Sequence, residues 1–381
     1  MREVAIVEGA RTPFGRAIKG SFRQTRPEDL GAAAVKATLA KAGFAADSIE
    51  DLALGCAMPE GSQGLNVARI VGFLSGMPHT VPAYTVNRFC ASGLQTVASI
   101  SARIAVGEMD RAIAGGVESM SAVPMSGFHP QLHPRLAVDY PEAYIGMGNT
   151  AENVAQRFEI SREAQDAFAA HSQTKALAAR EAGRLAEEIV AVETDVDGQS
   201  ITLKHDELIR AGTTEAGLAK LRPVFSATGS VTAGNSSPLT DGAAAVALCS
   251  ADALDGRIPL GYFRRFVTVG VEPEIMGIGP VPAIQALLDR TGLKVDDIDL
   301  FEINEAFASQ SVYCQQELAI PIDRLNVNGG AIAIGHPLGV TGTRLVLTAL
   351  KELGRRGGRF AVVSMCIGGG MGAAALLERT S

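Results

Sequence analysis

The sequence predicts an α/β protein made of two similar βαβ halves, each a mostly parallel sheet covered by helices. Three observations carry this prediction: a gapless internal repeat, a looser second pairing of strand–turn–helix segments, and a stretch between them where the pattern changes. Of the 381 residues, 47% are hydrophobic and 20% are charged, which is typical of a globular chain with a large core.

The repeat joins residues 34–50, AVKATLAKAGFAADSIE, with residues 283–299, AIQALLDRTGLKVDDID. Each copy has apolar residues at helical spacing, a glycine at the helix end, a short acidic stretch and then an apolar strand. The pattern predicts one αβ unit that is used twice. Alanine-rich helices can also resemble one another by chance, and the repeat alone leaves that alternative open.

The second pairing sets residues 84–107 against residues 324–354. Both segments read as a strand, a turn of small residues and a long helix. Each is followed by a further apolar strand, RAIAGGVESM in the first case and RFAVVSMCIGG in the second. This order predicts a helix-covered, mostly parallel sheet in each half.

Between the halves, Met, His and Pro interrupt the chain, and an alanine-rich helix follows with Ser161 as its cap and Gly183 at its end. We predict an inserted loop domain over residues 118–241. Residues 1–117 plus 242–265 then form the N-terminal half, and residues 266–381 form the C-terminal half. Insertions of this kind often cover the site at the carboxyl ends of the strands.

Composition excludes several classes of function. The formal net charge of -7 argues against a nucleic-acid partner, which needs a concentrated basic surface. No apolar run approaches the roughly 20 residues of a membrane span, and the N-terminus reads as a strand and a turn, so we expect no signal peptide and a cytoplasmic protein. Five cysteines without CxxC spacing argue against a disulfide framework and a zinc site.

Cys90 lies between the apolar strand AYTVNRF and a helix, which predicts a position at the helix N-terminus. Unpaired amides there favour thiolate over thiol, so we expect the pKa of Cys90 to be lowered. The alternative is a buried, inert cysteine. Cys56, Cys249 and Cys314 lie in apolar contexts without glycine turns, and we interpret them as structural.

His336 lies in NVNGGAIAIGHPLG, whose glycines and proline argue against a regular helix and predict a tight loop after a strand. A histidine there can act as a base toward a thiol and then donate to a thioester oxygen. The alternative is a solvent-facing turn histidine. His129 and His133 have metal-ligand spacing, but a proline follows each and breaks the helix, so we predict no metal site.

Cys366 ends the strand RFAVVSM and precedes IGGGMG, a turn whose backbone amides could hold an oxyanion. These glycines do not fit a dinucleotide fingerprint, because no acidic residue follows at the required distance. Asn304 closes the strand DLFEI. An asparagine at a strand end can position a water or donate to an oxygen, or can simply form a turn.

Together, VNRFCASGLQ, NEAFA, NVNGGAIAIGHPLG and SMCIGGGMG resemble the thiolase family in content and order. ARTPFG, MGNTAENVA and VTAGNSSPLTDGAAA resemble further thiolase segments, so the resemblance covers nearly the whole chain. It implies the thiolase fold, with the two halves in a layered αβαβα arrangement, and a CoA-dependent acyltransferase.

The resemblance also implies residue roles. Cys90 takes the acyl group as a thioester, and His336 removes its thiol proton. Cys366 is the acid/base for the carbon–carbon bond. Asn304, through a water, and His336 form one oxyanion hole, and the backbone amides of Cys90 and Gly368 form the other.

For ligands, the resemblance implies coenzyme A as a co-substrate and no permanently bound cofactor. It points to six contacts for CoA on the side of the inserted domain: Met147, Arg210, Ala233, Ser237, Met276 and Phe307. It further implies a homodimer or homotetramer, with a multifunctional β-oxidation subunit as a candidate partner.

VGVEPEIMGIGPVPAI and FEINEAFASQSVYC are similar to degradative, broad-chain 3-ketoacyl-CoA thiolases. Gly146 and Gly217 stand where short-chain biosynthetic thiolases often have histidine and serine. We therefore expect thiolytic cleavage of 3-ketoacyl-CoA in fatty-acid breakdown. The alternatives are a biosynthetic acetoacetyl-CoA thiolase, a non-catalytic acyl-CoA-binding protein and a condensing synthase. The cysteine pair with the histidine argues against the binding protein, and the GHP segment together with SMCIGGGMG argues against the synthase.

Overall fold

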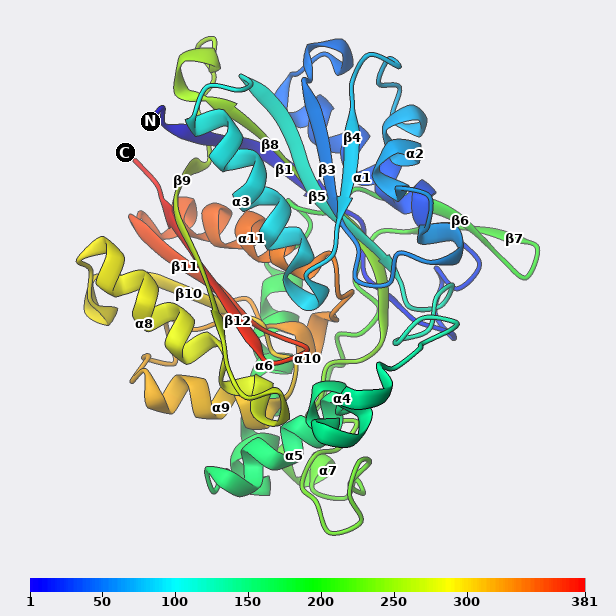
Figure 1. The fold of residues 1–381 in the computed structure, drawn as a ribbon, viewed down its shortest axis with the longest axis vertical. Coiled ribbons are helices and arrows are strands. Elements are labelled where there is room, and N and C mark those ends of the chain that lie inside the picture. Colours follow the sequence, from blue (N-terminus) through cyan, green and yellow to red (C-terminus); the bar gives the residue numbers. More distant parts are fainter. Residues whose placement is uncertain (381) are drawn as a thin grey trace.

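A ten-stranded sheet runs through both halves of the chain (Figure 1). The computed structural model describes residues 1–380. Neighbouring strands follow the order β10-β11-β12-β9-β1-β8-β5-β3-β4, and β2 pairs with β8. The strands of this sheet are β1 (Val4–Arg11), β2 (Gly15–Arg16), β3 (Asp51–Gly55), β4 (Ala83–Val86), β5 (Arg111–Ser119), β8 (Thr240–Ser250), β9 (Gly261–Gly270), β10 (Leu300–Ile303), β11 (Phe360–Ile367) and β12 (Met371–Glu378).

Helices form the layers above, between and below the two parts of the sheet (Figure 1). Helices α3 (Ser92–Ala105) and α11 (Thr341–Arg356) pack against each other in the middle, within the largest apolar cluster. Helix α1 (Pro27–Ala42) covers the outer face of β1 and β8, and α8 (Pro280–Thr291) covers the outer face of β9 and β12. This is the αβαβα layering that the resemblance implied.

The sheet is mixed, so the expected parallel pairing holds only in part. β3 is parallel to β4 and β5, and β10 is parallel to β11, because helical crossovers join these strands. The pairings of β8 with β1 and β5, of β12 with β9 and β11, and of β1 with β9 are antiparallel. The prediction of mostly parallel sheets is therefore correct next to the crossover helices and wrong at the centre.

The two halves repeat each other in detail, which removes chance similarity as an explanation. Helix α1 ends at Gly43 (φ 64°) and α8 ends at Gly292 (φ 71°), each in the left-handed conformation that glycine adopts readily. A 3₁₀ turn and a strand follow in both cases. Gly43 and Gly292 are as far apart in the sequence as Ser92 and Thr341, which are the first residues of α3 and α11. One sequence offset therefore relates both pairs of equivalent positions.

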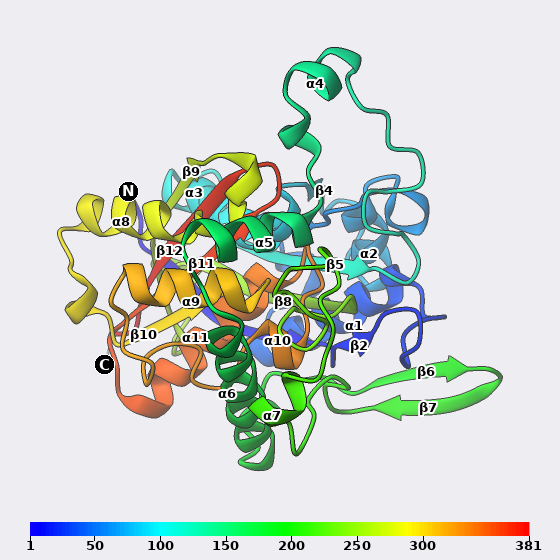
Figure 2. The same ribbon diagram turned by 90° about the horizontal axis from the view of Figure 1, so that it is seen from below.

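The segment between the halves contains short helices, a long helix and a hairpin. As expected, Ser161 Oγ accepts from the backbone N–H of Ala164 at the start of α6, and Gly183 follows its end with φ 75°. Figure 2 shows α4 and the hairpin β6–β7 projecting away from the layers. The elements are α4 (Pro134–Asp139), α5 (Met147–Arg157), α6 (Arg162–Glu181), β6 (Val192–Val196), β7 (Gln199–Leu203) and α7 (Glu215–Leu218).

The remaining helices are α2 (Val67–Leu74), α9 (Ala308–Glu317) and α10 (Ala331–Ile334). Within residues 1–380, no helix combines the length and the apolar composition that crossing a membrane requires.

Candidate active site

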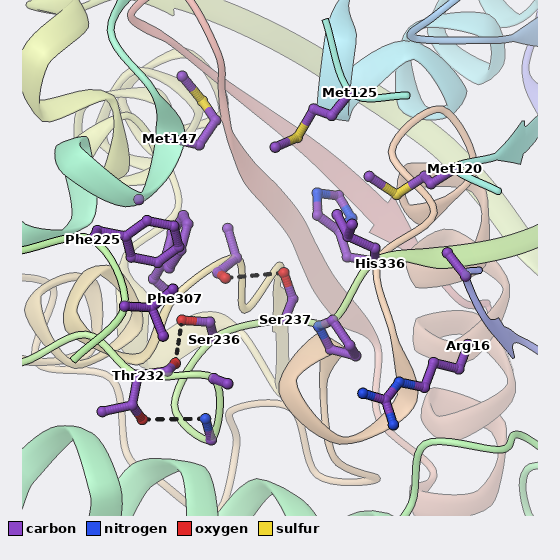
Figure 3. Close-up of a pocket in the computed structure, with 18 of the residues that line it drawn as sticks. Arg16, Met120, Met125, Met147, Phe225, Thr232, Ser236, Ser237, Phe307 and His336 are labelled. Carbon is purple, nitrogen blue, oxygen red and sulfur yellow. Dashed lines mark hydrogen bonds between the residues drawn. The ribbon is translucent and has the colours of Figure 1, made fainter. Parts of the chain in front are cut away.

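A cavity of about 640 Å³ opens where both halves meet the inserted segment (Figure 3). Cys90 and His336, predicted from distant parts of the sequence, both line it. Figure 3 shows Met147, Phe225 and Phe307 on one side and Met120 and His336 on the other. All the residues predicted to contact CoA also line this cavity: Met147, Arg210, Ala233, Ser237, Met276 and Phe307.

Cys90 sits on a strained turn between β4 and α3. The preceding residue, Phe89, has φ 43°, a conformation that costs free energy for a non-glycine residue. Hydrogen bonds hold this turn: Phe89 N–H donates to Asn87 Oδ1 (2.8 Å), and Ser92 Oγ donates to Phe89 O (2.6 Å) and accepts from Arg88 N–H (2.9 Å). The thiol therefore lies at the N-terminus of a helix, as the sequence predicted.

The predicted lowering of the Cys90 pKa is wrong for this structure. Burial removes water from the sulfur and raises the pKa of the Cys90 thiol to about 11. The backbone N–H groups of Gly368 and of Cys90 itself hydrogen-bond the sulfur and lower this pKa, but by less than burial raises it. The resting nucleophile is therefore a thiol, and it needs a base at the moment of attack.

His336 is buried and held at both ring nitrogens. Nδ1 lies 2.6 Å from Thr341 Oγ1, and Nε2 lies 3.2 Å from Asn304 Nδ2. The backbone N–H of His336 donates to Thr240 Oγ1 (3.1 Å). Burial lowers the pKa of His336 to about 4, so the imidazole is neutral near pH 7 and able to accept a proton.

The loop that carries His336 differs from the prediction in two ways. Residues 331–334 form the single helical turn α10, although the flanking glycines argued against a regular helix. The strand expected before it is reduced to one parallel bridge between Leu325 and Phe301. Asn326 explains this, because it has φ 44° and its side chain pairs with the backbone N–H and C=O of Ile303, each at 2.8 Å. That side chain replaces the hydrogen bonds of a neighbouring strand.

Glycines bring the cysteine turn and the histidine loop together. A Cβ at Gly342 would lie 2.4 Å from the backbone nitrogen of Leu94, and a Cβ at Gly93 in α3 would lie 2.7 Å from the oxygen of Gly339. Real atoms do not approach this closely, so only glycine allows the N-termini of α3 and α11 to touch. Two segments far apart in sequence thus meet at one point.

Glu118, which sequence reasoning did not single out, joins the histidine loop to the loop after β3. Its buried carboxylate accepts from the backbone N–H groups of Ala57 (2.7 Å), Met58 (3.2 Å) and Gly339 (2.7 Å), and from Gln63 Nε2 (3.1 Å). Burial raises the pKa of Glu118, and these donors act in the opposite direction. A carboxylate at the end of an apolar strand is the signal that could have found it.

Cys366 lies on β11 behind the wall of the cavity and not on its surface. It is buried in an apolar cluster with Met276 and Phe307, which do line the cavity. Burial is the main cause that raises the pKa of Cys366, and the negative charge of a Cys90 thiolate raises it further. The two sulfur atoms are therefore close enough to interact electrostatically. Asn304, which follows β10 as predicted, donates its backbone N–H to the oxygen of Ser364 (2.9 Å), on the same strand as Cys366. The two sulfurs and the imidazole therefore converge on one region.

The other three cysteines are fully buried and free, which agrees with a structural role. Arg210 is a cation on the cavity wall, and Arg16 and Lys19 line the same cavity from the N-terminal half. Gly368 lies against the inserted segment, since a Cβ there would meet Met147 Sδ at 3.3 Å.

Comparisons with known proteins agree with this geometry. Residues 4–252 match the family model "Thiolase, N-terminal domain", and residues 257–379 match "Thiolase, C-terminal domain". The chain is 53% identical over 390 residues to 3-ketoacyl-CoA thiolase of Bacillus subtilis, covering 99% of this chain and 100% of that protein. It is 50% identical to peroxisomal 3-ketoacyl-CoA thiolase B of Mus musculus, covering 99% of this chain and 91% of that protein.

A solved structure is also similar. The crystal structure of the Bacillus anthracis acetyl-CoA acetyltransferase superposes with a TM-score of 0.92 at 36% sequence identity, and the match covers 99% of each chain. The motifs, the layered fold and these matches lead to one conclusion: the chain belongs to the thiolase family.

Proposed function

We propose that this chain is a 3-ketoacyl-CoA thiolase, which uses CoA to cleave 3-ketoacyl-CoA into acetyl-CoA and a shortened acyl-CoA. One observation carries the proposal: Cys90 and His336 line the same cavity as the six predicted CoA contacts. Cys366 lies directly behind that wall. Relatives named 3-ketoacyl-CoA thiolase, about half identical over nearly the whole chain, support the same activity.

In the first half-reaction, His336 Nε2 accepts the proton of the Cys90 thiol while the sulfur attacks the 3-keto carbon of the substrate. The C2–C3 bond then breaks. Cys366 gives its thiol proton to C2, which releases acetyl-CoA and leaves a Cys366 thiolate and an acyl-Cys90 thioester. Because burial disfavours both the thiolate and the imidazolium, proton transfer has to accompany bond formation.

In the second half-reaction, the thiolate of Cys366 accepts the proton of an incoming CoA thiol. The CoA sulfur attacks the thioester carbonyl, and Cys90 leaves and recovers its proton from His336. The products are the shortened acyl-CoA and the starting enzyme, so the kinetics are ping-pong.

Two groups of polar atoms in the site would stabilise the negative charge that develops on the carbonyl oxygens of the substrate. The N–H groups of Cys90 and Gly368 lie beside the Cys90 sulfur and lower its pKa, and we propose that they also donate to the oxygen of the thioester that forms on this sulfur. On the other side, Asn304 Oδ1 is buried without a protein hydrogen-bond partner among the described residues. An unpaired buried oxygen fits the water that we propose Asn304 holds beside His336.

The wall near Cys90 favours substrates with an apolar chain. Met120, Leu338 and Ala17 pack with Cys90, and Met125 and Leu239 extend the same apolar wall. Methionine side chains adapt to different shapes, so this wall suits acyl chains of several lengths. The cavity volume also lies within the range that holds a small-molecule ligand.

A chain-length profile tests the degradative assignment. We expect kcat/KM for thiolysis of 3-ketodecanoyl-CoA to equal or exceed that for acetoacetyl-CoA. A collapse on the longer chain would instead support the biosynthetic acetoacetyl-CoA thiolase. If the absorbance of magnesium-complexed acetoacetyl-CoA stays flat after CoA and protein are added, the chain is a non-catalytic acyl-CoA-binding protein.

The proposal includes an assembly and a location. We propose a homodimer or homotetramer, because the edge strand β4 lies beside α2, whose Ile70, Phe73 and Leu74 are exposed apolar residues. Sedimentation of the purified protein measures the oligomer. We further propose a cytoplasmic enzyme, an inserted domain over residues 118–241 that binds CoA, and an association with a multifunctional β-oxidation subunit that co-purification would reveal.

A further inference from the structure

We propose that Thr341 is a positioning residue that fixes the tautomer of His336, so that the lone pair that accepts the Cys90 proton lies on Nε2. The inference rests on the proposed function, in which His336 is the base for Cys90. Thr341 is the first residue of α11, it is buried, and no sequence motif pointed to it.

The hydrogen bonds of one hydroxyl group determine where the imidazole proton lies. Thr341 Oγ1 donates its single proton to the backbone oxygen of Pro337 at 3.1 Å. The same oxygen lies 2.6 Å from Nδ1 of His336, and with its proton on the Pro337 oxygen it accepts from Nδ1. Nδ1 thus carries the proton of the neutral ring, and Nε2 carries the lone pair.

The opposite side of the ring favours the same tautomer through a longer contact, so the shorter contact to Thr341 carries most of the preference. Asn304 Nδ2, which can only donate, lies 3.2 Å from Nε2 of His336. An Nε2 that carried a proton would face this amide proton. Both partners therefore place the lone pair on Nε2, the nitrogen on the side of Asn304.

This tautomer matters because the alternative cannot perform the first step. With the proton on Nε2, the ring would have to take the thiol proton at Nδ1, which faces Thr341 and not the cavity. Fixing a catalytic imidazole through its second nitrogen is a common function of residues behind an active site, and their loss costs roughly 10–100-fold in activity. We expect that range for Thr341.

The test compares three variants. Thr341→Val keeps the shape and removes the acceptor, and Thr341→Ser keeps the acceptor. Thr348→Val is the matched control, because Thr348 is a buried threonine on the same helix whose hydroxyl has no hydrogen-bond partner among the described residues. Two readouts are needed: the rate of Cys90 acylation in a single turnover, and the ¹⁵N chemical shifts of the His336 ring, assigned among only six histidines.

We expect Thr341→Val to slow acylation roughly 10–100-fold and to shift the ring proton toward Nε2. Thr341→Ser and Thr348→Val should match the wild type in both readouts. An unchanged His336 tautomer in Thr341→Val would overturn the inference about Thr341. A changed tautomer with an unchanged acylation rate would show instead that His336 is not the base, which contradicts the proposed function as well.

Discussion

The turn before α3 and the turn before α11 occupy equivalent places in the two halves but present different groups. In the N-terminal half, Ser92 Oγ accepts from the backbone N–H of Arg88 and donates to Phe89 O. In the C-terminal half, the equivalent hydroxyl of Thr341 donates to the backbone oxygen of Pro337 and lies 2.6 Å from Nδ1 of His336. The first turn presents a thiol, and the second presents an imidazole.

This difference shows how two copies of one structural unit can each present a different side chain to the same site. Both halves supply the N-terminus of a buried helix, and glycines let these two ends touch. On the proposed roles, the identity of a few side chains on each turn decides which half attacks and which half accepts the proton. Substitutions in each half can break this division of roles, and their expected effects range from the loss of turnover to small changes in stability.

Replacing the nucleophile should have the largest effect. Cys90→Ser should lower kcat by a factor on the order of 10⁴ or more, because a buried hydroxyl is much harder to deprotonate than a thiol. Steady-state thiolysis measures this. Cys249→Ser is the control, since Cys249 is buried in the sheet away from the cavity, and it should keep its turnover. Equal losses in both variants would contradict a special role for Cys90.

The second cysteine should separate acylation from carbon–carbon chemistry. Cys366→Ala should lose roughly 10²–10⁴-fold in overall thiolysis, the usual range for removing a general acid/base. The variant should still be acylated by acyl-CoA. Mass spectrometry of a proteolytic digest should find the label on Cys90, and a label on any other residue would refute the assignment.

The two halves also differ in how they hold buried carboxylates. Glu118, on β5 at the border of the N-terminal half, accepts from backbone and side-chain N–H groups, whereas both oxygens of Glu302 in the C-terminal half lack hydrogen bonds to the described residues. In Glu118→Gln, the NH₂ group of the new side chain faces N–H donors that had bonded a carboxylate oxygen. The substitution should therefore lower the free energy of unfolding by about 2–3 kcal/mol. Urea denaturation measures it, and Glu181→Gln, at an exposed position, should change it by less than about 0.5 kcal/mol.

Glu302 should make stability depend on pH. Burial raises the pKa of Glu302 from 4.5 to about 8, and the cation of Arg344 is 3.9 Å away. Between pH 4.5 and about pH 8, Glu302 is protonated in the folded protein but ionised in the unfolded chain. The free energy of unfolding that this difference contributes is therefore fully present below pH 4.5 and is lost as the pH rises to about 8. Glu302→Gln mimics the protonated acid.

The variant should therefore gain stability relative to the wild type between about pH 6 and about pH 9, by about 2–3 kcal/mol. Denaturation midpoints at both pH values measure the gain. Parallel curves for the two proteins would mean that Glu302 is already ionised in the folded state.

Local patterns predicted most of the fold. The helix ends at Gly43 and Gly292 follow from glycine's access to the left-handed conformation, which depends on a single residue. The antiparallel pairing of β1 with β8 was not predicted, because these strands lie far apart in sequence and their register depends on contacts that no local pattern contains.

The residues of the candidate site also fall into two classes: those that local sequence patterns predict, and those that only the folded structure reveals. Cys90 and His336 are found from the turns around them, which are local features of the chain. Glu118 and Thr341 act through hydrogen bonds that cross between the halves or depend on the folded loop, and spacing does not reveal these bonds. The prediction for the pKa of Cys90 was wrong because the helix terminus is visible in the sequence, whereas the depth of burial is not.

The touching glycines between α3 and α11 have a consequence for protein synthesis. The ribosome makes Cys90 early and His336 late, and the two meet only after α11 has docked against α3. On the proposed roles, the nascent thiol has no base beside it during most of translation. On these roles, base-assisted acylation of Cys90 therefore begins only after α11 has been made and has folded against α3.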